Sequence, residues 1–227
     1  MGRRPRRARP GWGREVNGPS WVLLAATVAA AILDWWAVGA GARRVELIAK
    51  PVTLLCLLAA AVAVDPTDEA VRAWFVAALG LSLLGDVFLL FPDRFFLPGL
   101  VSFLLGHLAY IVGFWVGDID TTAFLIGVLV VAAALATLGR RILVGVRHSD
   151  EPELSAPVLV YVVVISTMVA SAIGSTIPAA VAGSVLFYVS DALIAWSRFI
   201  EDHRWTRLAI IVTYHLGQIG LVLSLVS

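Results

Sequence analysis

Eight long apolar runs follow one another along the chain, and they limit what it can fold into more than any other feature does. Each is about 20 residues long, the length that a helix needs to cross the hydrocarbon core of a bilayer. Strands of a membrane β-barrel are shorter and alternate in polarity, so helices are favoured. The runs lie approximately at residues 20–38, 46–64, 72–91, 98–116, 121–138, 156–174, 178–197 and 205–226. With 60% hydrophobic residues, the sequence predicts an all-α polytopic membrane protein, a bundle of about eight transmembrane helices.

The first 20 residues differ from the rest of the chain. They contain six arginines with proline and glycine and show no apolar periodicity, which indicates a disordered basic tail at residues 1–20. A cleaved signal peptide is less favoured, because the first run is long enough to span and ends in Asp34, Trp35 and Trp36, a stretch typical of a membrane interface. We therefore expect Asp34 to reach water and to carry no chemistry. The connections are short, so residues 21–227 are predicted to form a single transmembrane helical domain.

Polar residues occur inside several runs, and they gather in one half of the membrane. Consecutive helices alternate in direction, so odd-numbered runs end at the face where even-numbered runs begin. Asp86 and Asp191 lie near the ends of the third and seventh runs, and Lys50 and Tyr161 lie near the starts of the second and sixth. At about 1.5 Å per residue, the two acids lie roughly 8 Å inside one face. Below them we expect a floor made by His107, Tyr110, Tyr214 and Gln218.

Two interpretations account for this polar layer. An ionisable group in the middle of a bilayer costs at least about 2.5–3.5 kcal/mol, so the residues need a compensating role. In the structural interpretation, Lys50 pairs with Asp86 or Asp191 and only fixes helix register. The functional interpretation is favoured, because one ion pair would not need so many polar partners. His215 points away from the face of Tyr214, and we expect it to bond a neighbouring helix.

Metal and cofactor motifs are scarce in the sequence. There is no H-x-x-x-H or H-E-x-x-H pair, and Lys50 would compete with a cation, so no metal site is predicted. A zinc site of Asp86, His107 and Asp191 is the less favoured alternative. No glycine-rich phosphate loop follows a strand, so no cofactor is expected, and Cys56 has no second cysteine with which to pair. The basic tail is interpreted as a membrane-surface segment, not a nucleic-acid-binding one.

Several short motifs occur in order along the second to the eighth run. They are Lys50-Pro51, LGD at 84–86, RFF at 94–96, GHLAY at 106–110, Tyr161, SD at 190–191 and TYHLGQ at 213–218. In these motifs the chain resembles the YhhN family of membrane proteins, which includes the animal TMEM86 lysoplasmalogenases. His215 departs from the pattern, because relatives more often carry an aromatic residue there, and the tail before Trp21 lies outside it.

The resemblance implies hydrolysis of the vinyl ether bond of a lysoplasmalogen to a fatty aldehyde and a glycerophospho-base. Such a bond is cleaved by protonation of its β-carbon and attack of water on the resulting cation, and two carboxyls can divide the acid and base roles, as in glycosidases. Asp86 and Asp191 are therefore expected to meet across one pocket as catalytic residues, with His107 relaying protons or orienting water. The expected substrate-binding residues are Lys50, Tyr110, Tyr161, Ser190, Tyr214 and Gln218.

Two alternatives stay open at this stage: a hydrolase of another lysolipid, and a proton-coupled carrier whose buried aspartates titrate. Carriers tend to show internal repeats and broken helices, and neither is evident. The expected partners are a lysophospholipid substrate and membrane lipids, in the plasma or inner membrane if the host is bacterial. Nine arginines near the odd-numbered loops would attract anionic head groups, but seven on the other side leave the orientation open. The sequence does not predict an oligomeric state.

Overall fold

The computed structural model describes residues 18–227, apart from the side chains of residues 92 and 93. Within this range eight helical segments are long and apolar enough to cross a membrane, so the predicted spans are confirmed and the chain is an integral multi-pass membrane protein. Seven segments contain one α-helix each: α1 Gly18–Ala40, α2 Arg43–Ala63, α3 Glu69–Leu89, α4 Pro92–Val116, α7 Ser155–Gly174, α8 Pro178–Phe199 and α9 Thr206–Leu223. The fifth span joins α5 Thr121–Ala134, the π-helical turn η1 Leu135–Gly139 and α6 Arg140–His148. Two short 3₁₀ turns complete the chain, η2 Pro152–Leu154 and η3 Ser224–Val226.

Two helix boundaries in the structure differ from those predicted from the sequence. α1 begins at Gly18, so the last three residues of the predicted tail are helical, and the rest of that tail lies outside the described residues. The connection predicted from residue 139 is largely helical, because α6 continues the fifth span to His148. α6 is amphipathic: Ile142 and Val146 are buried, while its arginines are exposed.

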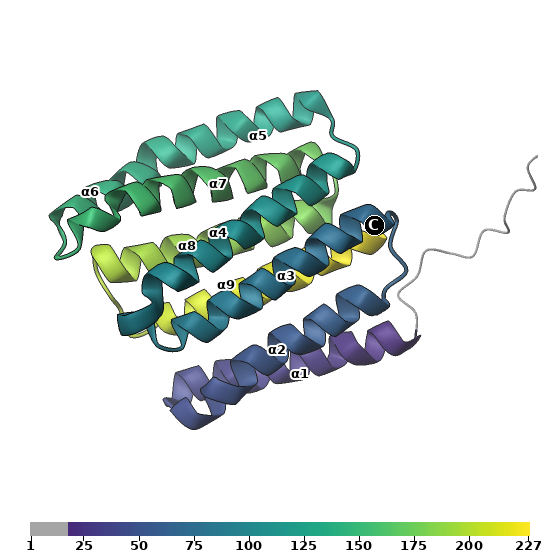
Figure 1. Cartoon of the computed structure of the whole chain (residues 1–227), viewed down its shortest axis with the longest axis horizontal. Helices are drawn as coiled ribbons and strands as arrows, with labels where there is room; N and C mark the ends of the chain where they lie inside the picture. The colour runs from purple at the N-terminus through teal and green to yellow at the C-terminus, as the bar shows by residue number, and fades with distance from the viewer. Residues whose placement is uncertain (1–17) are drawn as a thin grey trace, which may run out of the picture.

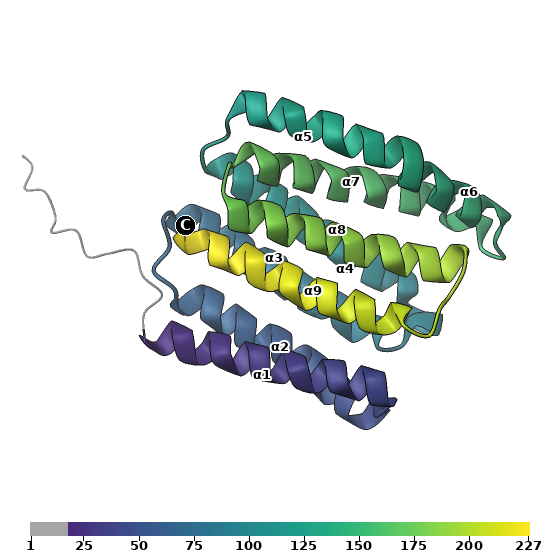
Figure 2. The ribbon, with the colours of Figure 1, turned by 180° about the vertical axis from the view of Figure 1, so that it is seen from behind.

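The helices lie side by side in one bundle (Figures 1 and 2). α1 and α2 form one edge and α5 lies at the other, with α3, α4, α7, α8 and α9 between them. α9 packs on α8 and also contacts α1, α2 and α3. The connections α1–α2, α3–α4, α6–α7 and α8–α9 all lie at the end of the bundle opposite to the C-terminus. The polar residues predicted near these connections therefore share one end of the molecule.

Glycines bring α8 and α9 into close contact. A Cβ added at Gly183 would lie 2.7 Å from the backbone nitrogen of Leu221, and one at Gly217 would lie 2.9 Å from the backbone oxygen of Gly183. Small residues allow such approach in a membrane, where helices associate by close packing because lipid tails are as apolar as their side chains. This contact fixes the rotation of both helices, and with it the direction of Asp191 on α8 and Tyr214 on α9.

α4 bends close to its start. Phe95 has non-helical dihedral angles, φ −123° and ψ 22°, and Pro98 follows inside the helix. Because proline has no amide hydrogen, it removes one bond of the helical ladder, and helices bend at such positions. The bent turn carries Phe96, which is buried and lines both cavities of the site described below.

Candidate active site

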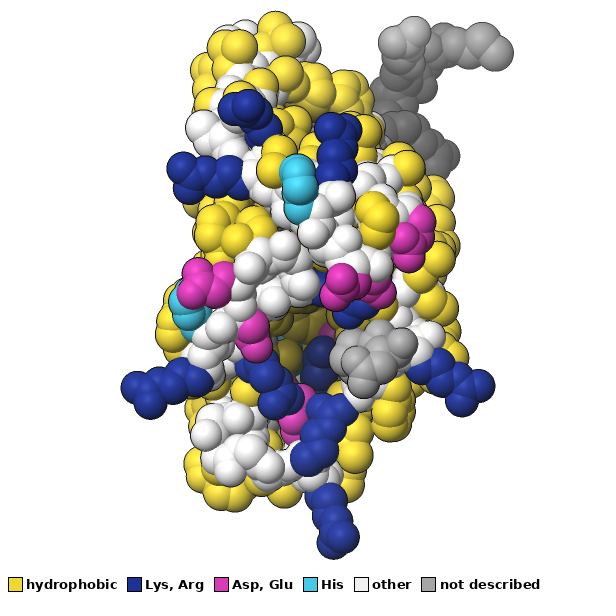
Figure 3. Space-filling model, turned by 90° about the vertical axis from the view of Figure 1, so that its left-hand side faces the viewer, with side chains coloured by type: hydrophobic (Ala, Val, Ile, Leu, Met, Phe, Trp, Pro, Cys, Tyr) yellow, Lys and Arg dark blue, Asp and Glu magenta, His cyan; other side chains and the backbone are white. Residues whose placement is uncertain are grey.

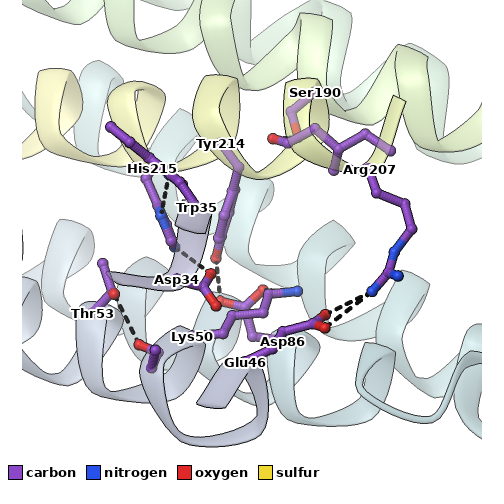
Figure 4. A network of polar contacts seen from close by, with 12 residues as sticks. Asp34, Trp35, Glu46, Lys50, Thr53, Asp86, Ser190, Arg207, Tyr214 and His215 are labelled. Atoms are coloured by element: carbon purple, nitrogen blue, oxygen red, sulfur yellow. Dashed lines mark hydrogen bonds and ion pairs between the residues drawn. The ribbon is translucent and has the colours of Figure 1, made fainter. Parts of the chain in front are cut away.

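Three helices place a first polar group around Asp86. Lys50 Nζ of α2 lies 3.0 Å from Asp86 Oδ1 of α3, and the Tyr214 hydroxyl of α9 donates a hydrogen bond of 2.7 Å to Asp86 Oδ2. Asp86 is only 1% exposed, so its charge is balanced by these partners and not by water. Figure 4 shows the side chains of this group together. The ion pair considered from the sequence is therefore present, with Asp86 as the partner of Lys50.

A second polar group surrounds Asp191 of α8. Its Oδ2 accepts a hydrogen bond from the Tyr161 hydroxyl of α7 and lies 3.0 Å from His107 Nε2 of α4. His107 Nε2 also lies 3.0 Å from the Tyr161 hydroxyl, so the three side chains form a closed triangle. His107 is fully buried, whereas the Asp191 side chain is 9% exposed. No described residue hydrogen-bonds Asp191 Oδ1, which leaves this oxygen available to a substrate.

The Phe187 ring contacts both polar groups. The Phe187 ring centroid lies 4.7 Å from that of His107 and 5.2 Å from that of Tyr214. Between the described side chains, no hydrogen bond or ion pair joins Asp86 to Asp191. Each acid therefore has its own hydrogen-bonding partners, and a role of the two acids across one pocket stays a prediction.

The remaining sequence-predicted residues make other contacts. The Tyr110 hydroxyl donates a hydrogen bond of 2.6 Å to Gln218 Oε1, and both side chains are fully buried. Gln218 follows Tyr214 by one helical turn, so the Tyr110–Gln218 pair lies one level deeper than Asp86. The Ser190 hydroxyl donates to the backbone carbonyl of Ile210 at 3.0 Å, which ties α8 to α9. The Ser190 hydroxyl thus links two helices. It forms no described hydrogen bond with Asp86, Asp191 or their partners.

Asp34 is buried, and the expectation that it reaches water is wrong. It is 0% exposed, and its Oδ2 lies 4.0 Å from His215 Nε2 of α9. Trp35 Nε1 donates a hydrogen bond of 3.1 Å to His215 Nδ1, which confirms the predicted bond between His215 and a neighbouring helix. Successive helical residues are rotated by about 100°, so Trp36 is 58% exposed while Asp34 faces the bundle. The stretch is therefore divided between the bundle interior, where Figure 4 shows Asp34 and Trp35 beside His215, and the exposed surface, where Trp36 lies.

A pattern in the sequence could have identified Asp34. The buried positions of α1 are Ser20, Leu24, Thr27, Ala31, Asp34 and Ala37. They are spaced by three or four residues, as on one helix face, and most of them are small. Such a stripe is typical of a membrane helix that packs closely on its neighbours, and Asp34 belongs to it.

A cavity of about 420 Å³ with charged and apolar lining residues, here called the vestibule, opens at the end of the bundle that carries the α1–α2, α3–α4 and α8–α9 connections. Figure 3 shows this end hollowed, with basic and acidic side chains around the opening. The charged residues of its lining are Arg43, Glu46, Lys50, Arg198 and Arg207. Glu46 forms ion pairs with Arg43 at 2.8 Å and with Arg207 at 3.0 Å. Lys50 and Arg198 also pair with Asp86 and Glu151, which lie outside the lining, so four cations face three carboxylates and the vestibule keeps a small net positive charge.

A narrow apolar pocket of about 50 Å³ adjoins the vestibule. Leu89, Phe96 and Ile194 line both cavities, so they form the boundary between the two. Asp191 and Tyr161 line the apolar pocket among mainly aliphatic and aromatic side chains. Asp191 is the one carboxylate in the described lining. It therefore faces an apolar compartment that shares a wall with the vestibule.

Among the described side chains, no group of three or more histidine, cysteine, aspartate or glutamate residues could hold a metal ion. The zinc site considered from the sequence is not assembled. His107 contacts Asp191, but among the described side chains no hydrogen bond or ion pair joins either of them to Asp86.

The chain matches one protein family and several relatives that are named lysoplasmalogenase. The model of the YhhN family matches residues 45–225, which excludes α1 and with it Asp34 and Trp35. The chain is 31% identical over 183 residues to rat lysoplasmalogenase TMEM86B, covering 79% of this chain and 72% of the relative. It is 33% identical over 172 residues to the lysoplasmalogenase of Mycobacterium tuberculosis, covering 74% of this chain and 65% of the relative. With human lysoplasmalogenase TMEM86B the identity is 27% over 147 residues, or 65% of this chain and 61% of the relative. No solved structure matches the chain.

Proposed function

This chain belongs to the YhhN family, and we propose that it is a membrane-embedded lysoplasmalogenase. The reaction is hydrolysis of the vinyl ether bond of a lysoplasmalogen to a fatty aldehyde and glycerophospho-ethanolamine or -choline. The activity for which the rat and mycobacterial relatives are named supports this proposal. The observation that carries it is the position of Asp191, a carboxylate in an apolar pocket that adjoins a vestibule lined by four cations.

A lysoplasmalogen has the same order of parts as these two cavities. Its phosphate fits the vestibule, where Lys50, Arg198 and Arg207 supply positive charge. The first carbons of its alkenyl chain fit the apolar pocket, and the rest of the chain extends toward the bilayer. The vinyl ether joins these two parts of the lipid, so this pose brings the bond to Asp191.

In the proposed mechanism, Asp191 is the acid and then the base. Its Oδ2 already accepts from Tyr161 and lies beside His107 Nε2, so the reactive proton is carried on Oδ1. Transfer of this proton to the β-carbon leaves a carboxylate next to the oxocarbenium-like cation. Water then attacks the cation and returns a proton to Asp191, which forms a hemiacetal. The hemiacetal collapses to the aldehyde, and the glycerol oxygen leaves with the hydroxyl proton.

Asp86 has a different role in this proposal. Its carboxylate lines neither of the two described cavities, but it holds Lys50, which does line the vestibule. The Tyr214 hydroxyl fixes the second oxygen of Asp86. Asp86 is thus a positioning residue that directs the Lys50 ammonium toward the lipid phosphate. This proposal differs from the scheme expected from the sequence, in which Asp86 and Asp191 both take part in proton transfer.

The test compares two lipids of equal chain length on the purified full chain in detergent. We expect aldehyde from a lysoplasmalogen ethanolamine and no fatty acid from the corresponding 1-acyl lysolipid. Asp118→Asn is the matched control for Asp191→Asn, because Asp118 is an exposed acid at the opposite end of the bundle. We expect Asp118→Asn to keep wild-type activity. Fatty acid release from the acyl lipid would indicate a hydrolase of another lysolipid. No product from either lipid would contradict the enzymatic proposal and favour the carrier.

A further inference from the structure

A groove outside the proposed active site runs between the fifth span and the end of α8. It has a volume of about 770 Å³ and is lined by residues of η1, α6 and α8, including Arg140, Arg141 and Trp196. Its α8 residues differ from those of the vestibule, where Ile194, Ser197 and Arg198 contribute. The two cavities therefore lie on different sides of the last turns of α8.

The groove carries cations that pair with no described carboxylate of residues 18–227. Arg140 and Arg141 are both exposed, and neither forms an ion pair with a described carboxylate. By contrast, Arg43, Arg198 and Arg207 in the vestibule each pair with a glutamate. The uncompensated charge of the groove is thus complementary to an anion.

The floor of the groove is apolar. Its lining includes Ala136, Val144, Phe199 and Ile200. Gly145 allows α6 to reach α8 there, since an added Cβ would lie 2.8 Å from Ile200 Cγ1 and 2.9 Å from the backbone oxygen of Phe199. Basic side chains above an apolar floor suit a molecule with an anionic head and hydrocarbon chains.

The length of the fifth span indicates where the groove lies in the membrane. The span has 28 residues, from Thr121 to His148, whereas about 20 residues cross the hydrocarbon core. Its last turns, which carry Arg140 and Arg141, therefore extend to the level of the lipid head groups. Trp196 in the same groove is typical of this interfacial level. α5, which leads to the groove, presents large exposed apolar side chains such as Leu125 and Leu129 to the bilayer.

We propose that this groove binds an anionic phospholipid of the surrounding bilayer. The lipid phosphate lies between the guanidinium groups of Arg140 and Arg141, and the acyl chains lie over the apolar floor and along α5. The bound lipid is distinct from the substrate, and the proposal does not depend on the reaction at Asp191. A basic side chain at a membrane surface strengthens binding of an anionic lipid about fivefold, so the arginine pair contributes about 25-fold.

The proposal is tested by native mass spectrometry of the purified full chain in a neutral detergent. Phosphatidylglycerol and phosphatidylcholine with identical chains are titrated, and their dissociation constants are compared. We expect wild type to prefer phosphatidylglycerol, and the double variant Arg140→Gln/Arg141→Gln to lose about 25-fold in affinity for it. The double variant Arg140→Lys/Arg141→Lys keeps the charge, and we expect it to keep most of the preference.

The matched control is Arg94→Gln/Arg147→Gln, which removes two exposed arginines from the same end of the bundle but outside the groove lining. We expect this control to bind phosphatidylglycerol like wild type. An equal loss in the control would show only general attraction by surface charge and would overturn the site. Equal affinity of wild type for the two lipids would also overturn it. Thermal unfolding of each variant, measured alongside, separates loss of binding from loss of folding.

Discussion

The stability lost on removing one partner of the Lys50–Asp86 ion pair depends on which partner is removed, because the two side chains differ in burial. Asp86 is 1% exposed and Lys50 is 15% exposed at the edge of the vestibule, with 3.0 Å between Nζ and Oδ1. Lys50→Met leaves the Asp86 carboxylate buried with one hydrogen bond, from Tyr214. Asp86→Asn leaves an ammonium that can turn toward the water of the vestibule. We therefore expect Lys50→Met to destabilise the protein more than Asp86→Asn does.

The expected magnitude follows from the cost of breaking a buried pair, about 3–5 kcal/mol. Because Lys50 reaches the vestibule, we expect Lys50→Met to lower the free energy of unfolding by about 3 kcal/mol and Asp86→Asn by about 1 kcal/mol. For a chain of this size, the larger loss lowers Tm by roughly 6–12 °C. The double variant Lys50→Met/Asp86→Asn removes both charges and should be more stable than Lys50→Met alone.

The assay is thermal unfolding of the detergent-solubilised protein, followed by circular dichroism. Glu69→Gln serves as the matched control, since it breaks an ion pair with Arg72 in which the glutamate side chain is 72% exposed. We expect this control to lose at most about 1 kcal/mol, as surface pairs do. A double variant no more stable than Lys50→Met would refute the reasoning, because the uncompensated charge of Asp86 would then not be the source of the loss.

Three further substitutions test other contacts. Tyr161→Phe removes a hydrogen bond to Asp191 and should lower kcat for lysoplasmalogen about 10- to 100-fold with KM little changed, as measured by initial rates of aldehyde release. Arg207→Gln removes a vestibule cation and should raise KM about tenfold with kcat little changed; an effect on kcat alone would contradict phosphate binding there. Gly183→Ala places a Cβ 2.7 Å from the backbone of α9 and should cost about 1–3 kcal/mol in thermal unfolding, whereas Gly39→Ala, with nothing within 4 Å, should cost nothing.

The eight spans and the polar layer could be predicted because both follow from membrane thickness. Hydrocarbon fixes the length of each run, and alternating helix direction places Asp86, Asp191 and Lys50 at one end of the bundle. The grouping of these residues could not be predicted. It depends on which helices are neighbours and how each is rotated, and runs that are apolar on all sides carry little information about rotation.

The positions of Asp34 and Ser190 depend on helix packing. The adjacent tryptophans suggested an interface for Asp34, but the rotation of α1 turns this acid into the bundle. Ser190 is next to Asp191 in sequence, yet its hydroxyl bonds the Ile210 carbonyl of α9 because α8 and α9 pack so closely. In both cases the packing partner, which is distant in sequence, decides where the side chain points.

The most direct test of the account is the hydrolysis of a lysoplasmalogen in D₂O, with immediate reduction of the aldehyde to its alcohol and mass analysis. Protonation of the β-carbon by an exchangeable acid predicts one deuterium on the carbon next to the former aldehyde carbon. Asp191→Asn should lower kcat by about 10²- to 10⁴-fold, the range for loss of a general acid. Aldehyde without this deuterium, or a wild-type rate in Asp191→Asn, would contradict the claim that Asp191 delivers the proton.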